Sequence, residues 1–181
     1  MVSIFTGMGA GYARGSGAIL GGGGLLGSGS FGRGGESVSV NGANGNLLIS
    51  NQDEFLVGRG PDIGISRTYN SAAELSDRDN GDNWQQSTTK RVYGLTGTLN
   101  TVGSTVSRQY GDGSAIVYTW NDIRKVYVTT DGDGAHDMLV KSGATWVWTD
   151  GSSQVTEVYE ATVANPTTEF RIKEQKDTDG L

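Results

Sequence analysis

The segment TVSRQYGDGSAIVYTW, residues 105–120, decides the fold. Two runs rich in β-branched and aromatic residues, 105–110 and 115–120, flank the dipeptide Asp112-Gly113. Such residues favour extended strands. An Asp-Gly pair between two strands is a strong hairpin signal, because a tight type I′ turn needs positive φ at both central residues. The segment therefore predicts an antiparallel β-hairpin.

The same turn signal recurs along the chain. Asp112, Asp131 and Asp150 each precede a glycine and lie nineteen residues apart, and the triplet Asp-Gly-Ser occurs at both 112 and 150. No stretch shows the sustained apolar spacing of 3.6 residues that marks a helix. We therefore expect an all-β fold: an antiparallel, twisted or spiralling sheet of β-hairpins. The turn glycines expected at positive φ are Gly42, Gly45, Gly113 and Gly151.

The first 35 residues differ sharply from the rest. They hold fourteen of the thirty glycines, and their only charged residues are Arg14 and Arg33. A tract of this composition is typical of a flexible linker. We therefore divide the chain into a Gly-rich N-terminal arm, residues 1–35, and a β-sheet domain, residues 36–181. The apolar residues of the arm have nothing to bury against within it, so we expect them to pack on a sheet or on a neighbouring chain as assembly residues: Ile4, Phe5, Ile19, Leu20, Leu25, Leu26 and Phe31.

Charge and composition exclude several function classes. The chain has a net charge of −6, and residues 36–181 carry all 20 acidic residues against 12 basic ones. No basic stripe is present to neutralise phosphates, so no nucleic-acid partner is expected. The absence of cysteine excludes disulfides and thiolate catalysis.

Membrane insertion is not expected either. The uncharged run 15–32 contains too few large apolar residues for a spanning helix. The N-terminus lacks the positive region and the apolar run of a cleavable signal peptide. With this cysteine-free, acidic, Gly- and Asp-rich composition, the expected location is extracellular or on the cell surface, without a cleavable signal.

One acidic loop is a candidate for calcium. Asp131, Asp133 and Asp137 have the relative spacing 1, 3, 7, and Ca²⁺ prefers carboxylate and carbonyl oxygens. The EF-hand pattern fails, because His136 stands at the sixth position and Ser142 at the twelfth. The alternative is that these residues form Asx-rich turns, which are hydrogen-bonded locally. No other cofactor is expected.

The sequence offers little for catalysis. His136 is the sole histidine, and no Gly-x-Ser-x-Gly element accompanies it, so we interpret it as a turn residue and expect no enzyme activity. The aromatic residues allow two interpretations, a sugar-stacking platform or packing on a sheet face. They are Trp120, Trp146, Trp148, Tyr118, Tyr127 and Tyr159.

Three blocks carry a family resemblance: NGNLLISNQD (44–53), GRGPD (58–62) and ISRTYNS (65–71). Their order is similar to the opening segment of bacterial Rhs/YD-repeat proteins, which has a G-N-L strand, a G-R-G turn and an R-x-Y-N-S strand. The hairpins YGDGS (110–114) and WTDGS (148–152) resemble those of the same family. The resemblance extends over roughly residues 38–181.

The resemblance implies a long spiralling β-sheet, which in full-length Rhs proteins closes into a shell around a C-terminal toxin. This chain shows no full set of Tyr-Asp repeats and no toxin, so it is expected to be an N-terminal fragment or a short relative. Our first hypothesis is a bacterial structural protein that forms homo-oligomers or filaments through edge strands and the arm. The alternative is the N-terminal module of a toxin-encapsulating shell. A weaker alternative is a carbohydrate- or calcium-dependent adhesive module.

Overall fold

The structure is a computed structural model that describes residues 3–5, 19–20, 29–31, 36–41, 44–58, 63–73, 83–129, 136–164 and 167–180. These residues form β-strands joined by turns, and no α-helix occurs among them. The prediction of an all-β, largely antiparallel fold is confirmed. The chain divides into two compact units: Met1–Leu56, Ile63–Thr88 and Tyr110–Ala115 form the first, and Val57–Asp62, Thr89–Gln109 and Ile116–Leu181 form the second. The arm boundary expected at residue 35 stays a prediction.

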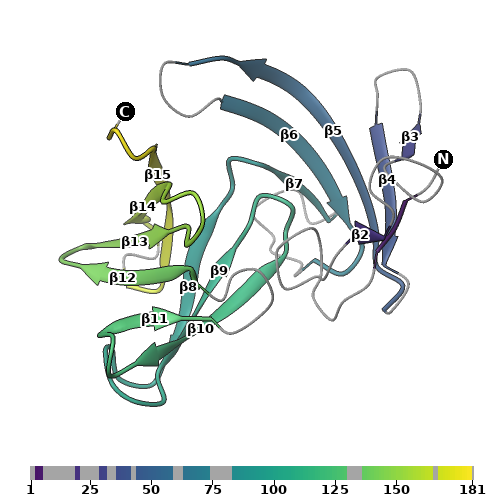
Figure 1. The fold of residues 1–181 in the computed structure, drawn as a ribbon. Coiled ribbons are helices and arrows are strands. Elements are labelled where there is room, and N and C mark those ends of the chain that lie inside the picture. The colour runs from purple at the N-terminus through teal and green to yellow at the C-terminus, as the bar shows by residue number, and fades with distance from the viewer. Residues whose placement is uncertain are drawn as a thin grey trace. The chain divides into compact units, whose positions relative to one another are not determined.

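The first unit is built on a seven-stranded sheet (Figure 1). Its strand order is β2-β1-β4-β5-β6-β7, and β3 also pairs with β4. The pairing of β1 with β4 is parallel, whereas β3 and β5 pair with β4 in the antiparallel sense. The bounds are β1 Ser3–Phe5, β2 Ile19–Leu20, β3 Gly29–Phe31, β4 Glu36–Asn41, β5 Leu47–Leu56, β6 Ile63–Asn70 and β7 Trp84–Gln86.

The buried face of this sheet is mainly polar. Thr68 and Asn70 of β6 are buried, whereas Arg67 before them and Tyr69 between them are more exposed. Leu48 on β5 is fully buried, and among the residues described for this unit it is the large apolar side chain in the core. A polar buried face needs hydrogen-bond partners for each group, and those partners define the first cluster described below.

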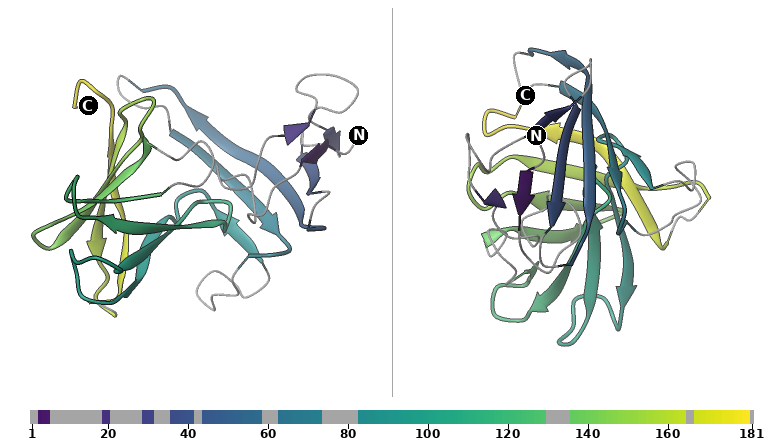
Figure 2. Two further views of the ribbon diagram at one scale, coloured as in Figure 1. Left: turned by 60° about the horizontal axis from the view of Figure 1, so that its bottom comes forward. Right: turned by 90° about the vertical axis from the view of Figure 1, so that its right-hand side faces the viewer.

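The second unit is a closed eight-stranded barrel with the order β10-β11-β12-β13-β14-β15-β8-β9 (Figures 1 and 2). Closure includes the antiparallel pairing of β15 with β8, in which Phe170 lies opposite Val92. A closed barrel has no free strand edge. The bounds are β8 Arg91–Thr96, β9 Thr105–Gln109, β10 Ala115–Asn121, β11 Val126–Val128, β12 Met138–Ser142, β13 Thr145–Thr149, β14 Thr156–Ala161 and β15 Glu169–Lys176.

Alternation along the strands fills the barrel interior. Trp146 and Trp148 of β13 are buried, while the residues between and beside them are partly exposed. Edge-to-face ring contacts link Tyr127 to Trp146 at 5.4 Å and Trp146 to Phe170 at 6.3 Å, measured between ring centroids. Eight strands leave an interior that side chains can just fill, and here large aromatic rings do so.

The expected turn glycines behave in two ways. Gly45 and Gly113 have φ of +75° and +80°, which confirms the prediction at these positions. Gly151 does not have positive φ, so the prediction there is wrong. Its lack of a side chain matters for another reason: a Cβ atom at Gly151 would lie 2.3 Å from His136 Cβ and 2.5 Å from the His136 carbonyl carbon. Gly42 lies outside the described residues.

Candidate functional site

The residues that carry the family resemblance hydrogen-bond to one another in the first unit. The buried Asn46 side chain accepts hydrogen bonds through Oδ1 from Ser71 Oγ at 2.9 Å and from the Ala72 amide at 3.0 Å. Ser71 Oγ in turn accepts from the Leu47 amide at 2.8 Å. The NGN block and the YNS block therefore fasten the start of β5 to the end of β6. We call Asn46, Asn70 and Ser71 the motif cluster.

The repeated Asp-Gly-Ser turn has the same local bonding at both positions. Asp112 Oδ1 accepts from the Ser114 amide and hydroxyl, and Asp150 Oδ1 accepts from the Ser152 amide and hydroxyl. These are Asx turns, in which the carboxylate replaces a backbone acceptor. Asn70 of the motif cluster donates through Nδ2 to the Asp112 carbonyl at 2.9 Å, so the turn and the motif cluster belong to one network.

A second polar group lies inside the barrel, and we call it the barrel charge cluster: Lys90, Arg108, Glu157 and Tyr159. Glu157 Oε1 accepts from Lys90 Nζ at 2.6 Å, and Oε2 accepts from Arg108 Nη2 at 2.5 Å. Tyr159 accepts from Arg108 Nε at 2.7 Å and donates its hydroxyl proton to Glu157 Oε2. The side chains of Arg108 and Glu157 are 1% and 3% exposed, so this ion pair is almost fully withdrawn from water.

The pKa values of the barrel charge cluster follow from burial and charge. Burial alone would raise the pKa of Glu157, but the charges of Arg108 and Lys90, together with hydrogen bonds from Lys90 and Tyr159, lower it to about 2. Burial, reinforced by the charge and hydrogen bond of Glu157, raises the pKa of Tyr159 well above its ordinary value, although Arg108 acts in the opposite direction. Glu157 is therefore an anion and Tyr159 a neutral donor across the physiological pH range.

These shifts predict how stability depends on pH. The pKa of Glu157 is depressed in the folded state, so its contribution is present above the ordinary value of 4.5 and is lost as the pH falls towards 2. The pKa of Tyr159 is raised on folding, so its contribution is present below pH 10 and is lost as the pH rises beyond it. Urea titrations between pH 2 and pH 11 should show the free energy of unfolding declining in both windows. Glu157→Gln should flatten the acid limb.

The arrangement of the barrel charge cluster suits structure better than chemistry. The Arg108 guanidinium carbon lies 3.8 Å from the centroid of the Trp148 ring, and Trp148 Nε1 donates to Tyr118 OH at 3.0 Å. The carboxylate, guanidinium and phenol thus bind one another, enclosed by aromatic rings. A catalytic group must reach a substrate, and these groups are buried.

A further polar group lines the barrel beside β8. Arg91 donates through Nε to Gln109 Oε1, and its guanidinium carbon lies 4.5 Å from the centroid of the Tyr93 ring. The buried Glu169 carboxylate lies 3.9 Å from Arg91 Nη1 and accepts from Arg171 Nε at 3.1 Å. Buried charges in the barrel are thus paired in two places, as a low-dielectric interior requires.

Sequence reasoning missed both barrel clusters, although a signal was present. Arg108 stands two residues after Val106 in β9, and Glu157 stands two residues before Tyr159 in β14, each on the inward face of its strand. In a strand, residues two apart share a face. A charged residue on the same strand face as buried apolar or aromatic residues was therefore a signal for a buried ion pair.

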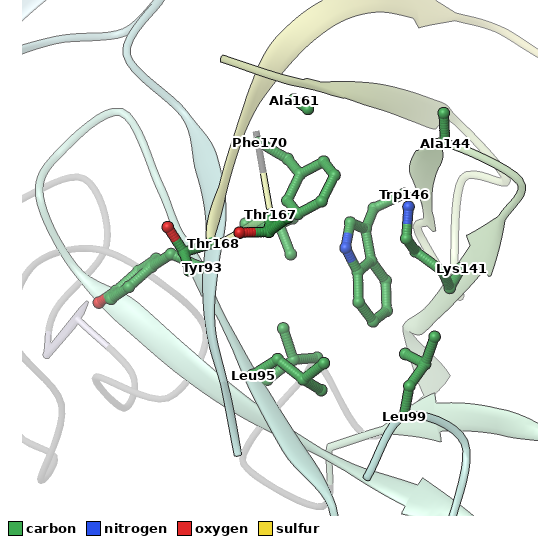
Figure 3. Close-up of a pocket in the computed structure, with 12 residues that line it drawn as sticks. Tyr93, Leu95, Leu99, Lys141, Ala144, Trp146, Ala161, Thr167, Thr168 and Phe170 are labelled. Carbon is green, nitrogen blue, oxygen red and sulfur yellow. The ribbon is translucent and has the colours of Figure 1, made fainter. Parts of the chain in front are cut away.

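The barrel also contains a pocket of about 330 Å³, shown in Figure 3. Trp146 and Phe170 line it in the upper part of the view, and Leu95 and Leu99, both partly exposed, line it below them. Lys141 is the charged residue among the lining side chains. The other lining residues are Val92, Tyr93, Val106, Ala144, Ala161, Thr167 and Thr168. Its volume lies at the lower end of the range found for small-molecule sites, about 300–1,000 Å³.

The calcium candidates are only partly described. Asp137 is buried, and its Oδ1 accepts a hydrogen bond from the Gly151 amide at 2.9 Å, which ties β12 to the Asp150 turn. Asp131 and Asp133 lie outside the described residues. In the part of the chain that the structure describes, no three His, Asp or Glu side chains converge as metal ligands. The calcium hypothesis stays a prediction. His136, immediately before Asp137, is exposed.

The aromatic residues considered for sugar stacking lie mostly inside the barrel. Tyr118, Tyr127 and Tyr159 are fully buried and Trp146 and Trp148 nearly so, whereas Trp120 is partly exposed and contacts the Tyr127 ring. Their position corresponds to packing rather than to an open platform.

The assembly residues of the arm stay a prediction. The backbone of β1 and β3 pairs with β4 of the same chain, and that of β2 pairs with β1. Leu25 and Leu26 lie outside the described residues, as do the side chains of Ile4, Phe5, Ile19, Leu20 and Phe31. No helix in the described ranges is long and apolar enough to cross a membrane.

No protein-family model matches the chain. A segment of 48 residues is 46% identical to the tRNA3(Ser)-specific nuclease WapA of Bacillus spizizenii. The same identity and length are found with the tRNA nuclease WapA of Bacillus subtilis strain 168 and with the tRNA(Glu)-specific nuclease WapA of Bacillus subtilis subsp. natto. The matched segment spans 26% of this chain but 2% of each nuclease. The similarity is thus confined to a short part of very large proteins.

Proposed function

We propose that this chain is a non-catalytic structural β module of a larger, Rhs-like bacterial protein. The observation that carries the proposal is the bonding of the resemblance residues. Asn46, Asn70 and Ser71 hydrogen-bond to one another's strands and to the Asp112 turn. Residues that serve a site face a ligand, whereas these residues hold strands and turns in register.

The barrel supports the same function. Two groups of charged residues are paired inside it, among them Glu157, which is bound by Lys90 and Arg108. Its strands form a closed cycle, so it offers no edge for pairing with another chain. A closed barrel with paired charges in its interior is suited to act as a rigid spacer or wall element.

The short similarity to the WapA nucleases agrees with a module inside a larger protein. The segment shared with those nucleases is a very small fraction of their length. A segment of this kind fits a small part of a protein whose activity resides elsewhere. The toxin, the extracellular location and any encapsulated cargo belong to this proposal.

Self-assembly into filaments is the second candidate function. It is favoured by the seven-stranded sheet, whose order ends at β2 and β7 rather than closing. In this alternative the arm and the end strands of the sheet join neighbouring copies, with the homo-oligomer as the working form.

Solution mass and electron microscopy separate the two candidates. Size-exclusion chromatography with light scattering should give a monomer of 19.0 kDa for the structural module, and negative-stain micrographs should show no filaments. Concentration-dependent oligomers or filaments that disappear when residues 2–35 are deleted, with the β-sheet circular dichroism retained, would instead establish self-assembly through the arm.

A further inference from the structure

We propose that the barrel pocket binds a small amphiphile that combines an apolar body with one carboxylate, such as a medium-chain fatty acid, with Lys141 holding the carboxylate. This inference is independent of the structural role proposed above. It rests on the shape and lining of the pocket and on the environment of the lysine ammonium.

The apolar body of the ligand is inferred from the side chains that line the pocket. Trp146, Phe170, Val92 and Val106 are buried and contribute apolar surface, while Leu95 and Leu99 are 40% and 37% exposed. Large apolar side chains left partly exposed around a concavity favour an apolar occupant, because covering them removes their surface from water. Figure 3 shows these two leucines below Phe170 and Trp146 in the view.

The head group of the ligand is inferred from the surroundings of Lys141. Its Nζ lies 4.6 Å from the Phe170 ring centroid and 5.8 Å from the Trp146 ring centroid. It donates to the Gly143 carbonyl at 3.0 Å and, at 3.4 Å, to the Thr145 carbonyl. None of its contacts within the described ranges is with a carboxylate. The two carbonyls take two of the three ammonium protons, and one proton is left for an acceptor in the pocket.

Charge complementarity selects an anion. Partial burial lowers the pKa of Lys141, because it disfavours the charged ammonium. A carboxylate would supply a charge-assisted hydrogen bond, and such bonds are roughly twice as strong as neutral ones. An alcohol of the same length would fill the pocket without that bond, and a cationic amphiphile would place two like charges together.

The pocket size limits the ligand to a short body, so a ten-carbon chain is a suitable probe. We suggest isothermal titration calorimetry of the full chain with decanoate, decanol and decyltrimethylammonium, each below its critical micelle concentration. The three probes share a tail and differ in head-group charge. Saturable binding at one site is expected for decanoate, about tenfold weaker binding for decanol, and weaker binding still for the cation.

Two variants test the head and body contributions separately. Lys141→Met keeps most of the stem and should remove the preference for decanoate over decanol, with decanol affinity little changed. Ala144→Phe, at an exposed turn position on the pocket, should fill the cavity and weaken both probes. Lys173→Met is the matched control, because it removes the same charge from an exposed ion pair with Glu160 outside the pocket lining and should bind decanoate like the wild type.

The outcomes decide the proposal. Saturable decanoate binding that is weakened by Ala144→Phe, and that loses its head-group preference in Lys141→Met alone, supports it. Absence of saturable binding by folded wild-type protein overturns it. So does equal affinity for all three probes, or decanoate binding that Ala144→Phe leaves unchanged, since these results would indicate nonspecific association with apolar surface. Circular dichroism of each variant shows whether the barrel is folded.

Discussion

Arg108→Met is expected to lower the free energy of unfolding by about 3–5 kcal/mol, because it leaves the Glu157 carboxylate buried without its closest cation. Arg108 also donates to Tyr159 and lies over the Trp148 ring, so its removal withdraws a hydrogen bond and a cation–π contact as well. Chemical denaturation followed by tryptophan fluorescence measures the effect, and Trp148 lies directly beside the substituted side chain.

Two further variants, a control and a double variant, are needed to interpret the Arg108→Met result. Lys173→Met breaks the exposed pair with Glu160 and should leave the midpoint of unfolding almost unchanged. The double variant Arg108→Met/Glu157→Gln should recover part of the loss, because the buried carboxylate that Arg108 helped to neutralise is then also removed. If the Arg108→Met and Glu157→Gln effects were simply additive, the barrel charge cluster would not be the coupled unit described here.

Gly151→Ala is expected to destabilise the barrel by about 1–3 kcal/mol through overpacking. The new Cβ would lie 2.3 Å from His136 Cβ, 2.5 Å from the His136 carbonyl carbon and 2.6 Å from its oxygen. Two of these atoms belong to the backbone, which cannot rotate away as a side-chain tip can. A shift of the Gly151 backbone away from His136 would also strain the hydrogen bond from the Gly151 amide to Asp137. Thermal unfolding of the variant measures the loss.

Gly64→Ala is the matched control for this substitution. The Cβ at Gly64 would meet Phe55 Cδ2 at 3.7 Å, an ordinary contact, and Gly64 lies within a strand. Replacing a strand glycine by alanine at compatible dihedral angles is neutral or slightly stabilising. Equal melting temperatures for Gly64→Ala and Gly151→Ala would show that the approach of His136 to Gly151 does not constrain the fold.

The all-β class and most strand positions could be predicted from turn chemistry and side-chain alternation. The hairpin predicted at 105–120 forms β9 and β10, with Gly113 at positive φ. Local signals suffice here, because the five-residue connection 110–114 and its flanking strands are close in sequence. The residues Leu47–Leu56 form one strand, β5, whose pairing with β6 is irregular between Gln52 and Glu54.

Barrel closure and the buried polar residues could not be predicted in the same way. Closure depends on the pairing of β15 with β8, strands separated by most of the second unit, and no local pattern encodes such a register. The buried face of β6 was also hard to foresee. Apolar Ile65 is less buried than polar Thr68 and Asn70. Asn70 can be buried because it donates a hydrogen bond to the Asp112 carbonyl, and that turn is distant in sequence.

In the candidate site, too, only the features with a local sequence signal could be predicted. The Asp-Gly-Ser turns at 112 and 150 were recognised from their repetition, and their internal hydrogen bonds explain the repeat. The role of Gly151 was misread, because a close approach by His136 has no signature in the neighbouring sequence. The pocket was not foreseen, since its lining converges from several strands and from the turn that holds Ala144.

We propose that this chain is structural and not catalytic, and a tRNA-cleavage assay tests this proposal most directly. Bulk bacterial tRNA is incubated with the purified chain, with and without Mg²⁺, and the intact fraction is measured by gel electrophoresis. A structural module predicts that the tRNA stays intact under both conditions. Cleavage that co-elutes with the folded chain, and that is lost in His136→Ala or Glu157→Gln, would contradict the claim.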